Sequence, residues 1–385
     1  MKIGLVCPYN MARGGGVQEI VRAMRNELSR KGHTVKILAP QPREGNNYDT
    51  DGILFIGGGT DVRSPLHTTA HISVSADGEA IEQILESENF DILHFHEPWV
   101  PVLSRQILSR STSVNIATFH AKVPETLMSR TVVRVVTPYT KSVLKYLHEL
   151  TAVSESAAQY VKSLTDAPIS IIPNGIDLTR YRKPAVSTEG ARSPKTILYI
   201  GRLERRKGIK YLLKAFALLA REYPDTELLL AGDGPDREKL ELMVEDLEIP
   251  NVRFLGFVDE ETKRNLLQSA DLFCSPAVYG ESFGIVLLEA MASGLVTVAG
   301  DNSGYTALMK DLGALSLVDP HDTPEFARRL SLLLNEPKLR NLWRQWATGY
   351  VRQFGYPKVV GQYEALYAAA LAHHQKSNAG VRLAA

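Results

Sequence analysis

Two glutamates stand eight residues apart in the stretch GESFGIVLLEAMASG, residues 280–294. Glu281 lies in a glycine-bounded turn, where a carboxylate can face a ligand. Glu289 lies in an apolar run typical of a buried helix. Because removing a carboxylate from water costs free energy, at least one of the two is expected to meet a partner. A buried carboxylate such as Glu289 suits a vicinal diol, as on ribose; the alternative is a structural carboxylate satisfied by the fold.

Basic residues gather in a second stretch, GRLERRKG, residues 201–208. Arg202 and Lys207 stand five residues apart in a predicted strand-to-helix loop, with Arg205 and Arg206 between them. An arginine can grip phosphate oxygens as a fork, and a lysine adds a point charge. The loop is therefore a candidate diphosphate site. The alternative is a solvated basic turn, since runs of charge are usually on the surface.

Backbone amides supply two further candidate anion sites. The amides near Phe283, Gly284, Ile285 and Val286 form a predicted helix N-terminus, which can hold a phosphate. The loop PYNMARGGGVQE, residues 8–19, also follows a predicted strand and opens a helix, and its glycines allow a ligand to approach closely. The alternative there is a merely flexible turn.

The loop over residues 8–19 does not match the site that binds a nicotinamide cofactor. It lacks the G-x-G-x-x-G spacing, and the second predicted strand ends at residues 39–41, APQ, with no acidic residue for a ribose hydroxyl. A nicotinamide-dependent dehydrogenase is therefore disfavoured.

Alternating strands and helices must position these residues. Short β-branched runs alternate with amphipathic helical stretches, of which residues 17–32 are the clearest helix. The predicted strands are residues 2–7, 34–39, 91–96, 115–120, 169–172, 196–201, 226–232, 252–256, 270–276, 295–300 and 314–318. This alternation predicts α/β architecture with parallel sheets wound on both sides.

The length of 385 residues exceeds one ordinary core, so two domains are expected. We predict an N-terminal Rossmann-like domain over 1–172, a linker over 173–195, and a C-terminal Rossmann-like domain over 196–355. Residues 356–385 are predicted to form a helix that crosses back to the N-terminal domain, followed by a tail. Two such domains would leave a cleft where strand ends and helix N-termini converge.

Composition narrows the class of protein. The formal net charge of +1 offers no electrostatic case for nucleic acid as a partner. Cys7 and Cys274 form no metal or redox spacing, which suggests a reducing compartment. The start of the chain lacks the apolar core of a signal peptide, and no apolar run reaches the length of a membrane span. We therefore expect a cytoplasmic protein, with peripheral contact at the inner face of the cell membrane as an extension of that hypothesis.

The motifs together resemble a known family. GESFGIVLLEA is similar to the E-x7-E motif of the retaining GT-B glycosyltransferases of family 4. The resemblance covers nearly the whole chain and is strongest toward the phosphatidylinositol mannosyltransferases, which share the opening IGLVCPY and the GESFGIVL run. The other matching segments are GGGVQ (14–18), HFHEP (94–98), ATFH (117–120), IPNGID (172–177), GRLERRKG (201–208) and AGDGP (231–235).

The resemblance implies a GT-B fold, with two Rossmann-like domains facing across a cleft, and a role for each matching position. His120 would contact the transferred sugar and Glu281 its hydroxyls, while Glu289 would bind the ribose. Arg202 and Lys207 would hold the pyrophosphate. The remaining donor-site positions are Gly15 and Gly16 near the diphosphate, Phe283, Gly284, Ile285 and Val286 around a phosphate, and Val258 and Lys263 beside the nucleobase.

The resemblance also implies a nucleotide-sugar donor, with GDP-mannose expected, and no metal cofactor. The pair His94-x-His96 lacks a third ligand for a metal. Cations and amides would instead stabilise the charge on the departing diphosphate. Front-face attack, with no obvious nucleophilic carboxylate opposite, would retain the anomeric configuration.

The acceptor site is where the sequence departs from the mannosyltransferases. Their strongly basic stretch corresponds here to residues 57–86, which contain one arginine, Arg63. Tyr9, Gln18, Arg63 and Lys122 are the candidate acceptor-binding residues. The basic amphipathic segment 121–148 either lies on an anionic membrane surface or packs on the sheet as an ordinary helix pair kinked at a proline.

We therefore expect a retaining hexosyltransferase that moves mannose from GDP-mannose to a lipid-linked acceptor such as phosphatidylinositol. One alternative keeps the chemistry but uses UDP-glucose or another donor, with a diacylglycerol or a soluble sugar as acceptor. Two others belong to different classes: a non-catalytic nucleotide-sugar binding module and a nucleotide-sugar epimerase.

Overall fold

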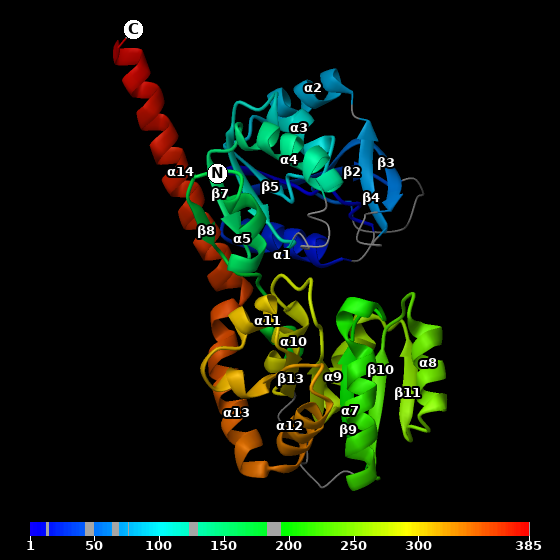
Figure 1. Ribbon diagram of the computed structural model, residues 1–385. Helices are drawn as coiled ribbons and strands as arrows, with labels where there is room; N and C mark the ends of the chain where they lie inside the picture. Colours follow the sequence, from blue (N-terminus) through cyan, green and yellow to red (C-terminus); the bar gives the residue numbers. More distant parts are fainter. Residues whose placement is uncertain are drawn as a thin grey trace. The chain divides into compact units, whose positions relative to one another are not determined.

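The computed structural model describes residues 1–12, 15–42, 50–63, 69–75, 77–122, 130–182 and 194–384, without the side chains of 59–75, 130–135 and 377–384. The chain forms two compact units, shown in Figure 1. The first combines Met1–Gly175 with Tyr356–Ala385, and the second is Ile176–Gly355. Each is an α/β unit around a mainly parallel sheet, so the predicted fold class is confirmed.

The first unit contains a sheet whose order, over the described residues, is β4-β3-β2-β1-β5-β6-β7-β8. All neighbours pair in parallel except β3 and β4, which are antiparallel. The strands are β1 (Lys2–Val6), β2 (Thr34–Gln41), β3 (Ile53–Arg63), β4 (Thr69–Ser75), β5 (Ile92–His96), β6 (Val114–Phe119), β7 (Glu149–Ala152) and β8 (Ile169–Ile171).

Helices cover this sheet, and one of them comes from the far end of the chain. They are α1 (Gly16–Arg30), α2 (Gly78–Glu88), α3 (Leu103–Leu108), α4 (Arg130–Leu144), α5 (Glu155–Lys162) and α14 (Tyr356–Ala384). The C-terminal helix α14, red in Figure 1, packs against α1 and β6. Lys31 and His33, at the end of α1, reach Glu364 of α14 at 2.7 and 2.8 Å.

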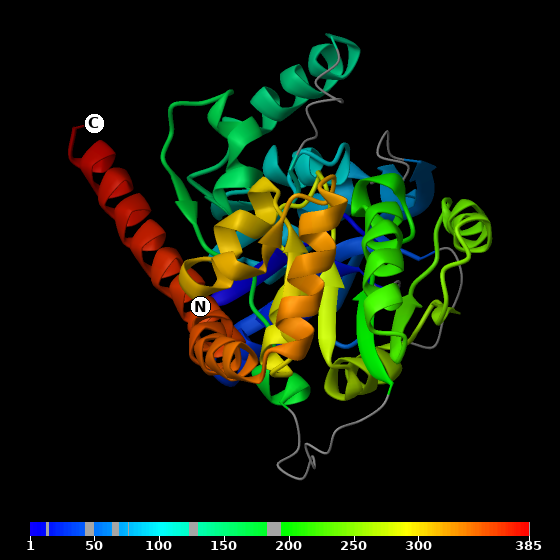
Figure 2. The same cartoon turned by 60° about the horizontal axis from the view of Figure 1, so that its bottom comes forward.

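The second unit repeats the architecture with a fully parallel sheet, whose described strands run in the order β11-β10-β9-β12-β13-β14. Its strands are β9 (Lys195–Ile200), β10 (Thr226–Ala231), β11 (Val252–Gly256), β12 (Leu272–Ser275), β13 (Val296–Gly300) and β14 (Leu317–Val318). Its helices are α6 (Leu178–Tyr181), η2 (Arg205–Lys207), α7 (Ile209–Glu222), α8 (Arg237–Asp246), α9 (Glu260–Ser269), α10 (Ile285–Ala292), α11 (Ser303–Leu308), η3 (Asp311–Ser316), α12 (Thr323–Asn335), α13 (Pro337–Tyr350) and η4 (Val351–Phe354). Figure 2 shows α12 (orange) beside α7 (green), its main helical contact in this unit.

The strand order places a reversal at the centre of each sheet. In the first unit the chain moves outward from β1 to β4 and resumes on the other side with β5; in the second the reversal falls between β9 and β12. Loops on the two sides of such a reversal diverge, so the carboxyl ends of those strands border the usual ligand site of doubly wound sheets. The residues after β1 and β5, and those after β9 and β12, are therefore the candidate ligand-binding positions.

The structure corrects three expectations about elements. Residues 314–318 do not form a five-residue strand, because η3 extends to Ser316 and β14 is only Leu317–Val318. Helix α4 is one helix, Arg130–Leu144, which continues through Pro138. Strands β3, β4 and β7 were not predicted, since β3 contains three glycines and β7 has four residues, so sheet pairing outweighs weak local propensity.

The boundary between the units also differs from the expected linker over 173–195. The division falls between Gly175 and Ile176, so residues 173–175 belong to the first unit and α6 belongs to the second. Ile176 pairs with Gly355 in a parallel bridge, which joins the two ends of the second unit. Residues 183–193 of the predicted linker lie outside the described residues.

Helix α14 is anchored in the first unit by buried hydroxyl groups. The Tyr367 hydroxyl lies 2.6 Å from Nδ1 of His94, and Oγ1 of Thr118 donates to the Tyr363 hydroxyl at 3.3 Å. Both tyrosines are at most 3% exposed. A residue near the C-terminus thus completes the hydrogen bonding of strands near the N-terminus.

We predict that Tyr367→Phe lowers the free energy of unfolding by about 1–3 kcal/mol, because it leaves a buried histidine nitrogen without its partner. Tyr363→Phe is the matched control: it removes a longer bond to a hydroxyl that has other partners, so its cost is smaller. Calorimetric unfolding of both variants measures the difference. Equal losses in the two variants would contradict the role given to Tyr367.

Candidate functional site

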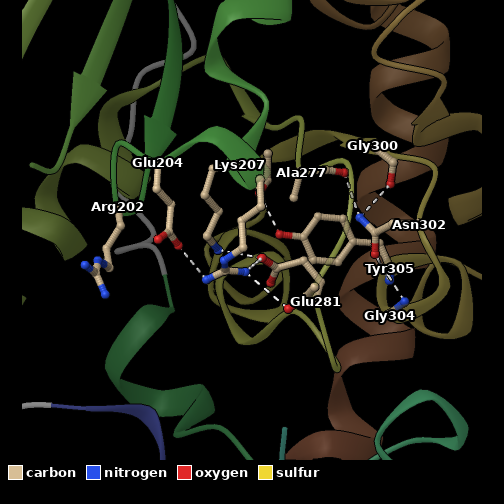
Figure 3. Close-up of polar contacts among 12 residues, drawn as sticks. Arg202, Glu204, Lys207, Ala277, Glu281, Gly300, Asn302, Gly304 and Tyr305 are labelled. Carbon is tan, nitrogen blue, oxygen red and sulfur yellow. Dashed lines mark hydrogen bonds and ion pairs between the residues drawn. The ribbon is translucent and has the colours of Figure 1, made fainter. Parts of the chain in front are cut away.

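Four charged side chains form a compact cluster at the carboxyl edge of the second sheet. Arg206 lies 2.7 Å from Glu204 through Nη2 and 2.7 Å from Glu281 through Nη1. Lys207 Nζ reaches the same Oε1 of Glu281 at 2.7 Å. The Glu204 and Glu281 side chains are 9% and 11% exposed. Figure 3 shows Lys207 and Glu281 pointing toward each other. The cluster carries two positive and two negative charges, which makes its burial tolerable.

Backbone geometry brings the two halves of this cluster together. The short helix η2 ends at Gly208, whose φ of 71° lies in the left-handed region. A Cβ atom there would stand 2.1 Å from the carbonyl oxygen of Pro276, just after β12. The loop after β9 can approach the end of β12 this closely only because residue 208 is glycine. A hydrogen bond of 2.8 Å from Val278 N to the Arg206 carbonyl closes the contact.

Electrostatics keep Glu281 ionised in this cluster. Burial alone would raise the pKa of Glu281, but Lys207 and Arg206 outweigh burial and lower that pKa below its ordinary value. Burial likewise opposes the charge of Arg206, and Glu281 and Glu204 raise its pKa in compensation. The carboxylate predicted to meet sugar hydroxyls is therefore an ionised acceptor held in one position.

Arg202 is not part of the cluster. Its side chain is exposed and makes no polar contact with the other residues drawn in Figure 3. Its carbonyl accepts a hydrogen bond from the buried Tyr199 hydroxyl at 2.9 Å, which fixes the main chain directly after β9. The structure thus places Lys207 against Glu281 and leaves the Arg202 guanidinium in solvent.

Helix α10 begins at the same edge, four residues after Glu281. Its N-cap residue, Gly284, has φ 101°, and a Cβ there would meet the ring of Tyr305 at 2.8 Å. The Tyr305 hydroxyl is 2.8 Å from Ser275 Oγ at the end of β12. Phe283 is buried and Ile285 and Val286 are half-buried. The four predicted phosphate-binding positions therefore form one helix start.

The amide side chain of Asn302 connects the loop after β12 to the start of α11. Asn302 donates through Nδ2 to the carbonyl of Ala277 at 2.8 Å, and its Oδ1 accepts from Gly304 N and Tyr305 N at 3.1 Å (Figure 3). The amide side chain thereby caps α11 and fastens it to the loop after β12.

Glu289 has partners of its own. Its Oε1 accepts from the Tyr181 hydroxyl and from Lys263 Nζ, each at 2.8 Å, and Lys263 also lies 2.9 Å from Glu260. A carboxylate buried in an apolar helix is thus satisfied within the fold, and a ribose would have to meet its Oε2. Val258, also predicted near the nucleobase, is half-buried beside the start of α9.

In the first unit, His120 follows β6 and is fixed through main chain and ring. Its backbone N–H donates to Oε1 of Glu97 at 2.6 Å, and the N–H of Ala121 donates to the same oxygen at 2.5 Å. Its Nε2 lies 2.8 Å from Nδ1 of His96. Glu97 follows β5 with a φ of 51°, and its other oxygen accepts from the indole N–H of Trp99.

Three buried histidines lie together at this edge, and burial governs their protonation. Burial lowers the pKa of His94 to about 3 and that of His96 well below its ordinary value of 6.5. Burial also lowers the pKa of His120 to about 4, although the Asn174 side chain opposes it. All three rings are therefore neutral at physiological pH. Burial raises the pKa of the neighbouring Glu97 to about 8.

The remaining predicted residues of the first unit follow β1 and β6 or, for Arg63, end β3. Gly16 is the first residue of α1, and Gly15 precedes it. Gly15 lies close to Gln18, because a Cβ atom on Gly15 would stand 2.4 Å from the amide oxygen of Gln18. Gln18 reaches the carbonyl of Asn10 at 3.4 Å. Tyr9 and Lys122 are half-buried. Arg63 ends β3, and its side chain lies outside the described residues, as do Arg13 and Gly14.

Neither a metal cluster nor a membrane span is found in the described parts. Among those residues no group of three histidine, cysteine or acidic side chains is placed to hold a metal ion. Within the same ranges, none of the helices has both the length and the apolar character that crossing a membrane requires. The basic segment 121–148 is described only in part, since residues 123–129 and the side chains of 130–135 fall outside.

Sequence reasoning missed several residues of the two sites. Arg206 and Glu204 stand inside the GRLERRKG motif, yet only pairing in three dimensions distinguishes Arg206 from Arg205. Tyr363 and Tyr367 are four residues apart on one helix face, a signal that could have been found. Nothing in the sequence pattern links Tyr181, in the predicted linker, to Glu289.

Comparisons with known proteins agree with this fold and these motifs. The family model "Glycosyltransferase Family 4" matches residues 14–180, and the model "Glycosyl transferases group 1" matches residues 186–349. A phosphatidyl-myo-inositol mannosyltransferase of Mycolicibacterium smegmatis is 32% identical over 95% of this chain and 93% of its own. The corresponding protein of Mycobacterium leprae is 30% identical over 95% of this chain and 96% of its own.

Solved structures share the fold at lower identity. Sucrose-phosphate synthase of Thermosynechococcus elongatus superposes with a TM-score of 0.75 at 20% identity, covering 97% of this chain and 99% of its own. Anabaena HepE, solved with UDP and glucose, gives 0.75 at 17% identity over 96% of this chain and 100% of its own.

Two Rossmann-like units with these motifs define a GT-B glycosyltransferase. The chain belongs to glycosyltransferase family 4, and phosphatidyl-myo-inositol mannosyltransferases are among its relatives across nearly its whole length. It is thus an enzyme of the transferase class, as the sequence predicted.

The charge cluster predicts a specific loss of stability. Arg206→Met leaves Glu204 and Glu281 buried with one cation, and we expect the free energy of unfolding to fall by about 3 kcal/mol. Arg205→Met is the matched control, because the exposed Arg205 lies one position away; its effect should stay within about 0.5 kcal/mol. Thermal unfolding of the two variants distinguishes them, and similar midpoints would sink the claim.

The buried histidines predict a loss of stability in mild acid. The folded rings of His94 and His120 have pKa values of about 3 and about 4, and that of His96 lies well below its ordinary value, whereas unfolded histidines bind protons near pH 6.5. Their contribution to stability is therefore full above pH 6.5 and is lost as the pH falls toward 4. We expect the unfolding midpoint to drop over this range, and less steeply in His96→Asn, which has one titrating ring fewer. Equal slopes in the wild type and in His96→Asn would contradict burial of a neutral His96 ring.

Proposed function

We propose that this enzyme is a retaining hexosyltransferase that moves mannose from GDP-mannose to a phosphatidylinositol-type lipid acceptor. The observation that carries the proposal is the Lys207–Glu281 contact at the carboxyl edge of the second sheet. It places a cation suited to a diphosphate 2.7 Å from a carboxylate suited to sugar hydroxyls. The relatives named as phosphatidyl-myo-inositol mannosyltransferases, at 30–32% identity, support the choice of sugar and lipid.

In the proposed reaction an acceptor hydroxyl oxygen bonds to the anomeric carbon while the bond from that carbon to the diphosphate breaks. Negative charge develops on the departing diphosphate, which takes up the proton of the hydroxyl on the same face of the sugar. Lys207, Arg202 and the amides at the start of α10 are proposed to stabilise that charge without reorganisation of solvent. Attack from the face of the leaving group retains the configuration.

The proposed roles of the other residues follow the same division. Glu281 binds sugar hydroxyls, and His120, with the amides of Gly15 and Gly16, serves the sugar and the diphosphate. Glu289 binds the ribose through Oε2, beside Val258 and Lys263 at the nucleobase. Because Lys207 is paired with Glu281 before any ligand binds, a diphosphate has to share or replace that contact. The proposal requires no metal cofactor.

The acceptor is proposed to bind to the first unit. Tyr9, Gln18, Arg63 and Lys122 are the proposed acceptor residues, and the enzyme would act in the cytoplasm at the inner face of the membrane. A second candidate transfers glucose from UDP-glucose to a diacylglycerol-type acceptor. It is favoured by the single arginine in residues 57–86 and by an alpha-monoglucosyldiacylglycerol synthase of Streptococcus pneumoniae that is 25% identical over 82% of this chain.

Calorimetric titration with GDP, UDP and ADP, without added metal, tests the donor. We expect GDP to bind more tightly than UDP or ADP, and Lys207→Ala to weaken GDP much more than it weakens guanosine. The control is Lys210→Ala, which removes an exposed lysine three residues further on. A preference for UDP would overturn the mannosyl proposal in favour of the second candidate.

Transfer assays then test the acceptor. Vesicles containing phosphatidylinositol, phosphatidylserine or diacylglycerol are incubated with radiolabelled GDP-mannose, and labelled lipid is extracted. Label in the phosphatidylinositol sample alone is the expected result. Label only with diacylglycerol, or release of free mannose with no labelled lipid in any sample, would overturn the lipid assignment.

A further inference from the structure

Within the described residues, the carboxylate of Glu289 is held through one of its two oxygens. The Tyr181 hydroxyl and the Lys263 ammonium both donate to Oε1, each at 2.8 Å, and no described residue bonds to Oε2. The Glu289 side chain is 7% exposed, yet Oε2 is not among the fully enclosed polar atoms that lack a partner, so it reaches the surface. A carboxylate that served only the fold would have both oxygens satisfied. Oε2 is therefore open to a ligand.

The two groups that hold Oε1 come from different helices. Tyr181 is the last residue of α6, which packs against α10, the helix of Glu289. Lys263 lies on α9, with its Nζ 2.9 Å from Glu260 and 5.7 Å from the centre of the Tyr181 ring. Arg180, beside Tyr181 on α6, lies 3.3 Å from Glu260. Three helices thus meet around one carboxylate.

The charges of this network balance without Tyr181. Arg180 and Lys263 are positive, and Glu260 and Glu289 are negative. Burial opposes the charge of Lys263, but Glu289 and Glu260 outweigh it and raise the pKa of Lys263. An ion pair of this kind makes a buried carboxylate tolerable. The Tyr181 hydroxyl is therefore not needed to compensate charge, and its contribution is to geometry.

A second fixed group is needed because neither partner of the ion pair sets the orientation of the carboxylate. The last torsion of a glutamate side chain is broad and nearly two-fold, so glutamate itself does not choose which oxygen points outward. A lysine ammonium is a point charge with three rotatable donors, so Lys263 could bridge both oxygens. The Tyr181 hydroxyl has one proton to donate and stands on a ring that is 2% exposed. Its bond to Oε1 selects one orientation.

We propose that Tyr181 is a positioning residue: its hydroxyl holds Oε1 of Glu289 and so leaves Oε2 to accept a hydroxyl of the ribose in the nucleotide-sugar donor. A carboxylate oxygen only accepts hydrogen bonds, so Oε2 selects nucleotides that carry ribose hydroxyls. The inference rests on the proposed function, which assigns the ribose to Glu289. It adds the residue that makes this contact selective.

Calorimetric titration with GDP and its dideoxy analogue, which lacks both ribose hydroxyls, tests the inference. We expect the wild type to bind GDP roughly 100-fold more tightly than the analogue, because a hydrogen bond to a charged group is strong. Tyr181→Phe keeps the buried ring and the Lys263–Glu289 pair but loses the hydroxyl, so Lys263 can bridge both oxygens. The preference for GDP should then fall to roughly tenfold. An unchanged or larger preference would overturn the inference.

Tyr350→Phe is the matched control. It removes another hydroxyl of the second unit, one that donates to the Leu308 carbonyl at 2.9 Å, and it should keep the wild-type preference. A purely structural role for Tyr181 would lower the unfolding midpoint and weaken both nucleotides by the same factor, and that result would contradict the inference. If Tyr181→Phe does not fold, Tyr181→Met makes the same test, because its flexible side chain fills the space without a hydroxyl.

Two further measurements separate this inference from the proposed function. If Glu289→Ala loses the preference for GDP over the analogue and Tyr181→Phe keeps it, the ribose role of Glu289 stands and the inference fails. Equal binding of GDP and its analogue to the wild type would overturn both. The same titrations with UDP and its dideoxy analogue cover the second candidate function: a preference for UDP that Tyr181→Phe reduces would support the inference and overturn the mannosyl proposal.

Discussion

Glu281 is a nearly buried carboxylate whose charge is compatible with burial because two cations from one short loop reach the same oxygen. That requirement constrains much of the second unit. The loop after β9 must approach the end of β12, which demands glycine at 208. The turn before α10 must present Glu281 to the loop, and the pairing of Arg206 with Glu204 balances the remaining charge. The proposed donor site is thereby held in place by charges of the protein itself.

Parallel topology explains why such distant residues meet. In each unit the sheet reverses direction at its centre, and the residues after the strands at the reversal lie at one edge. His120, His96 and Glu97 gather there in the first unit, and Lys207 and Glu281 in the second. The two units solve the same positioning problem differently: one edge depends on ion pairs, and the other on neutral rings and main-chain amides.

Buried polar side chains of the first unit are linked to one another by hydrogen bonds. Tyr367, His94, Thr118 and Thr151 form a chain of buried hydrogen bonds that ends at the carbonyl of Ala117. A network satisfied in this way is rigid, and removing a member leaves a buried group unpaired. Helix α14 takes part in it, which ties the end of the chain to the strands that carry the histidines.

The sequence by itself determined the family, the fold class, and most strands. The motifs around Glu281, Lys207 and His120 have chemistry that depends on residue type and short-range spacing, and the apolar runs of β1, β5 and β12 are buried on both faces whatever surrounds them. Only the tertiary structure decided the partners. That Arg206 rather than Arg205 holds Glu281, that Tyr181 from the expected linker meets Glu289, and that Tyr367 completes His94 all depend on contacts between residues far apart in the chain. Such pairing is set by how helices and strands pack, and no local pattern encodes it.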